Sequence, residues 1–109
     1  MAGNERAADS AEPELDGSGI RLGIVCGRFN DHITLRLLDG ARRGASGAGV
    51  AVGAVVEEWV PGAFEIPMAA RAIARSGQVD AVVCLGAVIR GETSHYDFVA
   101  GECARGIQD

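Results

Sequence analysis

Lysine is absent from this sequence of 109 residues, and all ten basic residues are arginine. Without a lysine amine, the chain cannot form a Schiff base with a carbonyl substrate, attach pyridoxal phosphate or supply the lysine of a nucleotide-binding P-loop. Cysteine is scarce as well. Cys26, Cys84 and Cys103 are an odd number without metal-type spacing, which predicts reduced thiols in the core or on a helix face.

The sequence also lacks an excess of positive charge and long apolar runs. Its formal net charge is -5, and residues 19–109 hold nine arginines against ten acidic residues. Without a basic surface, binding to nucleic acid or to a membrane surface is not expected. No apolar stretch approaches the roughly 20 residues of a membrane span. No basic segment precedes a short apolar one as in a secretory leader, so we expect a cytoplasmic protein.

The first 18 residues differ in composition from the rest of the chain. They contain five acidic residues and one arginine, and their first large apolar residue is Leu15. Such a segment buries too little apolar surface to offset the entropy of ordering it. We therefore expect a disordered acidic tail over residues 1–18 and one domain over residues 19–109.

Three apolar segments have the composition of strands. They cover residues 20–26, 50–60 and 81–89, and β-branched residues are frequent in them. Segment 81–89 contains only apolar residues and one glycine, which is typical of a parallel strand covered on both faces.

The stretches that follow these strands have the apolar spacing of helices. The first helix is expected to follow the cap residue Asn30 and to end near Gly49. The second begins just before Pro67, which only a first helical turn tolerates, and stops at Gly77. A third begins at Ser94, which has an acidic residue three positions later. The expected buried faces are Ile33, Leu37 and Ala41 in the first helix, and Ile66, Ala69, Ala70 and Ile73 in the second.

Strands and helices that alternate with short connections predict a parallel sheet with right-handed crossovers. The predicted fold class is therefore α/β, a doubly wound, flavodoxin-like three-layer sandwich. Loops that follow the carboxyl ends of its strands meet at one edge, where open α/β sheets bind ligands. Residues 27–31, 61–65 and 90–95 form these loops, and the last of them starts a helix, which favours anions.

Two familiar phosphate motifs do not fit these loops. Residues 86–93 read GAVIRGET, with the glycine spacing of a P-loop, but Glu92 stands in place of the lysine and would repel a triphosphate. Loop 27–31 lacks the G-x-G-x-x-G pattern of dinucleotide folds. It also lacks the run of hydroxyls that would hold a flavin phosphate, so a flavodoxin proper is disfavoured.

His95 is the candidate for proton transfer. A lone histidine is usually structural, but His95 follows a buried strand and falls in the first turn of a predicted helix. A helix N-terminus disfavours the imidazolium, so a neutral ring that can accept a proton is expected. His32 has no such supporting feature and is interpreted as structural.

Several other loop residues allow two interpretations. Phe29 either packs onto the following helix or stacks on a flat heterocycle. Phe64 is expected in buried packing, and Glu65 is either a helix N-terminal charge or an acceptor for substrate hydroxyls. Thr93 and Ser94 are helix caps that can also bind phosphate.

Three separated motifs together resemble those of the 6,7-dimethyl-8-ribityllumazine synthase family. They are GRFND at 27–31, VPGAFEIP at 60–67 and LGAVIRGETSHYDFV at 85–99. The resemblance covers about residues 20–109. It implies a transferase that condenses 5-amino-6-(D-ribitylamino)uracil with 3,4-dihydroxy-2-butanone 4-phosphate. This reaction releases phosphate and water in the penultimate step of riboflavin synthesis, and it needs no metal or redox cofactor.

The resemblance also implies a role for individual residues. The pyrimidine would stack on Phe29, and it and its ribityl chain would be bound by Ala63, Phe64 and Glu65. The edge of the pyrimidine would be held by the main chain of Ala87, Val88 and Ile89. The butanone phosphate would meet Glu92 and Thr93, and His95 would shuttle protons. The implied partners are these small-molecule substrates and further copies of the chain, in a pentamer or a shell of pentamers. Riboflavin synthase is a candidate protein partner.

One departure from the family concerns length. Family chains continue past the third helix into a further strand and helices, which supply an aromatic residue to a neighbouring subunit's site and an arginine for the phosphate. This sequence ends at Asp109, so we expect it to be C-terminally truncated, without that final strand and those helices. The competing hypothesis is a non-catalytic homologue that binds a ribityl-pyrimidine or flavin-like ligand, or only co-assembles with full-length subunits.

Overall fold

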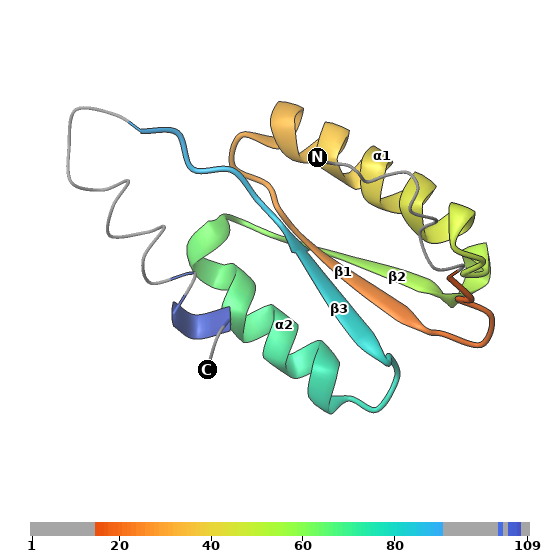
Figure 1. Cartoon of the computed structure of the whole chain (residues 1–109). Helices are drawn as coiled ribbons and strands as arrows, with labels where there is room; N and C mark the ends of the chain where they lie inside the picture. Colours follow the sequence, from red (N-terminus) through yellow and green to blue (C-terminus); the bar gives the residue numbers. More distant parts are fainter. Residues whose placement is uncertain (1–14, 91–102, 104, 108–109) are drawn as a thin grey trace, which may run out of the picture.

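The structure, a computed structural model, describes residues 15–90, 103 and 105–107 (Figure 1). Its elements are, in chain order, β1 (Leu22–Gly27), α1 (Asp31–Gly47), the short 3-10 helix η1 (Val52–Ala54), β2 (Val55–Val60), the 3-10 helix η2 (Ala63–Glu65), α2 (Ile66–Arg75) and β3 (Ala81–Leu85). Most of the predicted tail and the predicted start of a third helix at Ser94 lie outside the described residues. None of the helices in the described part of the chain is long and apolar enough to cross a membrane.

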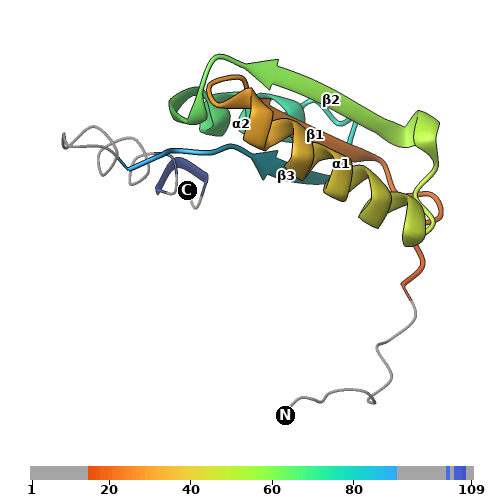
Figure 2. The same cartoon turned by 90° about the horizontal axis from the view of Figure 1, so that it is seen from above.

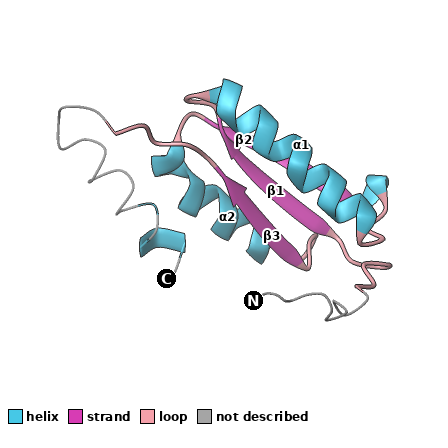
Figure 3. Ribbon diagram, turned by 45° about the horizontal axis from the view of Figure 1, so that its top comes forward, coloured by secondary structure: helices cyan, strands magenta, loops and turns pink. Residues whose placement is uncertain are grey.

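The three strands form one parallel sheet in the order β2-β1-β3 (Figure 3). β1 is central and buried along its whole length. Its ladder with β3 runs from Leu22–Ala81 to Cys26–Leu85. Its ladder with β2 runs from Leu22–Val55 to Gly27–Val60. All three strands therefore end at the same edge of the sheet, as predicted.

Alternate residues of β1 face the two helices on opposite sides of the sheet. Ile24 and Cys26 belong to a core cluster that includes Leu38 of α1. Gly23 faces α2, because a Cβ there would lie 3.3 Å from Cγ2 of Ile73. Figures 1 and 2 show α1 and α2 on opposite sides of the strands. This arrangement confirms the three-layer, flavodoxin-like α/β architecture.

The outer strands are shorter than predicted. Residues 50–54 do not extend β2, because Val52–Ala54 turn as a 3-10 helix. β3 ends at Leu85 and not at residue 89, since its pairing with β1 stops opposite Cys26. β3 is also only half-buried, which corrects the expectation of a strand covered on both faces. It is the outer strand of the described sheet, and so one of its edges has no paired strand there.

The buried face of α1 is shifted from the predicted one. Leu37 is 43% exposed, whereas Thr34 and Leu38 are fully buried. Of the predicted residues, Ala41 does pack against the core and Ile33 is half-buried, so only Leu37 is misplaced. The apolar spacing did not reveal that the fully buried face begins with a threonine.

In α2 the predicted face is confirmed in part: Ile66 is buried at the first position, whereas Ala69, Ala70 and Ile73 are only half-buried. Gly77 follows the helix, as predicted, with a left-handed φ of 77°.

The three cysteines are free thiols, as predicted. Cys26 is fully buried in the core, and Cys84 and Cys103 are half-buried. Burial disfavours the charged thiolate, so it raises the pKa of all three groups. These thiols therefore have the character of structural cysteines and not of nucleophiles.

Candidate functional site

A cavity of about 290 Å³ lies beyond the carboxyl ends of the three strands. Figure 1 shows the chain leaving all three strands on this side of the sheet. The segments after β1, β2 and β3 each supply one wall. The cavity is lined by Phe29, Pro61, Gly62, Ala63, Phe64, Glu65, Ala87, Val88 and Ile89.

The first wall is the loop between β1 and α1. Its backbone continues the β1–β2 ladder past the strand end, since Arg28 N donates to Val60 O at 2.7 Å and Phe29 N donates to Pro61 O at 2.9 Å. The Arg28 guanidinium lies over the Trp59 ring, 5.1 Å from its centroid. Phe29 is thereby fixed at its backbone while its side chain stays 68% exposed, so its ring is open to contact by a ligand.

Asn30 precedes α1 but does not cap it in the predicted way. Its side chain makes no capping hydrogen bond, and its backbone is left-handed, with φ 61° and ψ 42°. The Asn30 carbonyl accepts hydrogen bonds from the N–H groups of Ile33 and Thr34. The side-chain amide points elsewhere: Nδ2 donates to the Ala87 carbonyl at 3.2 Å, across to the segment that follows β3.

The second wall is the turn between β2 and α2. Glu65 N donates to Gly62 O at 3.1 Å, which closes the 3-10 turn of η2. Phe64 is 50% exposed and lines the cavity, so the expectation that it packs in the core is wrong. Glu65 stands at the start of α2 without a side-chain capping bond. Its carboxylate lies over Gly62, where an added Cβ would be 3.4 Å from Oε1.

The third wall is the irregular segment after β3. Gly86 passes close to α2, because a Cβ there would lie only 2.9 Å from Cδ1 of Ile66. Residues 87–89 have left the β1–β3 ladder, and Ile89 is 60% exposed. Main-chain polar groups that leave a ladder are freed from strand pairing. This segment therefore offers backbone donors and acceptors at the cavity.

Most of the predicted site residues come together here. Seven of them line the one cavity: Phe29, Ala63, Phe64, Glu65, Ala87, Val88 and Ile89. Glu92, Thr93 and His95 lie outside the described residues, so their parts in the site stay predictions. Sequence reasoning missed the bond from Asn30 to the third wall. The left-handed backbone of Asn30 had a local signal, because asparagine is one of the few residues that adopt it, but the partner of its side-chain amide had none.

A larger cavity of about 420 Å³ lies between α2 and β3. Arg71 and Arg75 line it together with Val82 and Cys84. It runs along the side of the outer strand and not at the strand ends. The smaller cavity is the better candidate because it lies where parallel α/β sheets bind ligands and because three loops converge on it.

The lining of the smaller cavity suits a flat, polar ring with a hydroxylated chain. Two exposed aromatic side chains, Phe29 and Phe64, offer stacking surfaces. The Glu65 carboxylate can accept hydrogen bonds from hydroxyl groups, and the main chain of residues 87–89 can pair with the edge of a heterocycle.

Comparison with known protein families agrees with this geometry. The sequence model of 6,7-dimethyl-8-ribityllumazine synthase matches residues 19–109, which include all three walls of the cavity. The match excludes only the first 18 residues. The chain therefore belongs to the 6,7-dimethyl-8-ribityllumazine synthase family of riboflavin biosynthesis.

Proposed function

We propose that this chain catalyses the condensation of 5-amino-6-(D-ribitylamino)uracil with 3,4-dihydroxy-2-butanone 4-phosphate to give 6,7-dimethyl-8-ribityllumazine. One observation carries the proposal: seven residues that the family motifs assign to the pyrimidine, from three separate loops, line a single cavity. Family membership supports the same reaction.

The cavity would hold the pyrimidine between its walls. Phe29 would stack on the ring, and the main chain of Ala87, Val88 and Ile89 would pair with its polar edge. Ala63 and Phe64 would border the ring and the ribityl chain. Glu65 would accept hydrogen bonds from the ribityl hydroxyls, since a carboxylate offers two acceptor oxygens.

The chemical steps need both orientation and proton transfer. The ring amine attacks the ketone and water leaves, phosphate is eliminated from the butanone, and ring closure releases more water. Holding two substrates in a reactive geometry supplies much of the acceleration. His95 would move the protons, and Glu92 and Thr93 would meet the phosphate at the start of the third helix.

The proposal extends to assembly and location. The family resemblance implies a homo-oligomer, a pentamer or a shell of pentamers, with sites between subunits. Large apolar side chains outside the cavity support further association, because Leu35, Val52 and Met68 are all more than half exposed. Riboflavin synthase is the candidate protein partner, and the cytoplasm is the proposed location.

The test is the full chain mixed with both substrates. Lumazine absorbance and fluorescence should appear together with inorganic phosphate, and His95→Ala should lower turnover by roughly 10²-fold while binding of a pyrimidine analogue persists. If no lumazine forms where another family member reacts, the catalytic proposal is wrong. Analogue binding without turnover would favour the non-catalytic homologue.

A further inference from the structure

We propose that Asn30 is a positioning residue, which aims the main chain of the third wall at the pyrimidine without touching the ligand itself. The inference rests on the proposed function, since it concerns how that site recognises its heterocycle. Asn30 is not among the residues that line the cavity. Its side-chain amide nevertheless donates to the carbonyl oxygen of Ala87, which does line it.

This bond fixes a peptide unit that the ligand would use. The Ala87 carbonyl and the Val88 N–H belong to one planar peptide and point in opposite directions. When Asn30 holds the carbonyl oxygen at 3.2 Å, it therefore also sets the direction of the Val88 N–H. A displaced peptide plane would misalign that donor, and hydrogen bonds weaken steeply with misalignment.

The bond matters because the ladder no longer holds this segment. Pairing between β1 and β3 ends at Cys26 and Leu85, so the Ala87 carbonyl lies beyond it. The Asn30 side chain spans 57 positions of sequence to reach this carbonyl, and the contact is partly buried. It thus replaces a ladder hydrogen bond at the point where the third wall begins.

The backbone of Asn30 makes this reach possible. The Asn30 carbonyl is held by two N–H groups of α1, and the N–H of the preceding Phe29 is held by Pro61. With φ at 61°, Asn30 is the one non-glycine residue of the described chain with a left-handed backbone. Most L-residues avoid this conformation, and asparagine is one of the few apart from glycine that adopt it. Asn30 thus joins the first wall to the third, next to the Phe29–Pro61 bond that joins the first wall to the second.

Two substitutions separate the amide from the backbone. Asn30→Asp keeps the shape but replaces the donor with a carboxylate, which cannot donate to a carbonyl when ionised. It also leaves a negative charge at the start of α1, where such a charge is favourable, so the helix is not weakened. Asn30→Gly removes the amide and keeps the left-handed backbone without strain. His32→Gln, at an exposed nearby position, is the control.

The first readout is taken on the ligand-free full chain by NMR relaxation. In both Asn30 variants the backbone order parameters of Val88 and Ile89 should fall from about 0.85 toward 0.6, while those of β1 stay unchanged. The control should match the wild type. Unchanged order parameters at Val88 and Ile89 in both variants would overturn the inference.

The second readout is the affinity for a non-reacting ribitylaminouracil analogue, measured by calorimetry. The dissociation constant should rise about 5- to 10-fold in both variants, because the hydrogen bond from the Val88 N–H to the ligand would be misaligned. Equal affinities in wild type and variants would also overturn the inference. If the wild type does not bind the analogue, the proposed function fails. The relaxation data then decide the positioning claim alone.

Discussion

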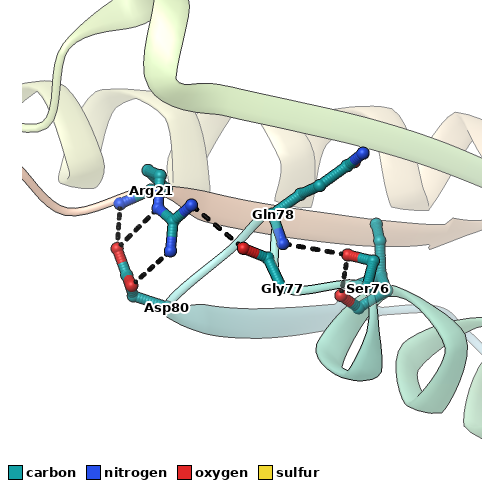
Figure 4. Close-up of polar contacts among 6 residues, drawn as sticks. Arg21, Ser76, Gly77, Gln78 and Asp80 are labelled. Atoms are coloured by element: carbon teal, nitrogen blue, oxygen red, sulfur yellow. Dashed lines mark hydrogen bonds and ion pairs between the residues drawn. The ribbon is translucent and has the colours of Figure 1, made fainter.

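Arg21 and Asp80 hold each other by hydrogen bonds in both directions at the amino ends of β1 and β3. Figure 4 shows the bonds that Arg21 donates to the Asp80 carboxylate. Arg21 N donates to Asp80 Oδ2 at 2.8 Å, Arg21 Nη2 donates to Oδ1 at 2.9 Å, and Asp80 N returns a bond to Arg21 O at 2.7 Å. Arg21 Nη1 also donates to Gly77 O, just past α2. This pair therefore closes the end of the sheet opposite the cavity.

Asp80→Asn should lower the thermal midpoint of unfolding, but only above acidic pH. Hydrogen bonds from Arg21 lower the pKa of Asp80 from 3.8 to about 2. A carboxyl group whose pKa is lower in the folded state stabilises the fold above its unfolded pKa. That contribution is lost as the pH falls from near 3.8 toward 2. The midpoints of wild type and variant should therefore converge over this range.

The control for this experiment is Asp39→Asn. Asp39 pairs with Arg43 within α1, and both side chains are mostly exposed. Such a pair contributes little to stability. The role assigned to the Arg21–Asp80 pair would be contradicted if Asp39→Asn lowered the thermal midpoint as much as Asp80→Asn does. It would also be contradicted if the midpoint of Asp80→Asn stayed below that of the wild type at the lowest pH.

Gly86→Ala should destabilise the chain through a single close contact. The new Cβ would lie 2.9 Å from Cδ1 of the buried Ile66, so that side chain must shift. Overpacking of this kind typically costs about 1–3 kcal/mol, which denaturant unfolding can measure. Gly27→Ala is a matched control, because its Cβ would meet Ile66 Cδ1 at an ordinary 3.6 Å.

A double mutant tests the cause of that loss. Ile66→Val removes the offending Cδ1, so Gly86→Ala should cost less in this background than in the wild type. If Gly86→Ala lowers the free energy of unfolding equally in both backgrounds, the contact between residue 86 and Ile66 is not what destabilises the variant.

Phe29→Ala should weaken ligand binding without weakening the fold. The Phe29 ring is largely exposed at the cavity, so its removal leaves the core intact. Loss of one aromatic stacking contact, about 0.5–1.5 kcal/mol, predicts a several-fold rise in the dissociation constant of a ribitylaminouracil analogue. Ile20→Ala removes a partly exposed apolar side chain just before β1, at the end of the sheet opposite the cavity, and should leave affinity unchanged. Equal affinities for Phe29→Ala and wild type would remove the ring from the site.

The sheet and the cavity walls were predictable because their signals are local. Apolar β-branched runs mark the strands, and Pro67 and Gly77 mark the limits of α2 because each restricts or frees the backbone. Loops after parallel strands must share an edge, so the meeting of Phe29, Glu65 and Ala87 follows from topology.

The sequence-based predictions were wrong or incomplete for residues whose placement depends on contacts with distant parts of the chain. Thr34 belongs to the buried face of α1, which apolar spacing does not reveal. Phe64 has a hydrophobic side chain in an apolar motif, yet the η2 turn directs it to the cavity. The Asn30 amide bonds a residue far along the chain, and no local pattern specifies such a partner.

The most direct test of the account is an amide NMR titration of the labelled full chain with the non-reacting ribitylaminouracil analogue. We expect the largest shift changes to cluster at Phe29, at residues 63–65 and at residues 87–89, which line the cavity beyond the strand ends. Changes centred on Arg71 and Arg75, in the larger cavity beside α2, or an absence of any change at saturating analogue, would contradict it.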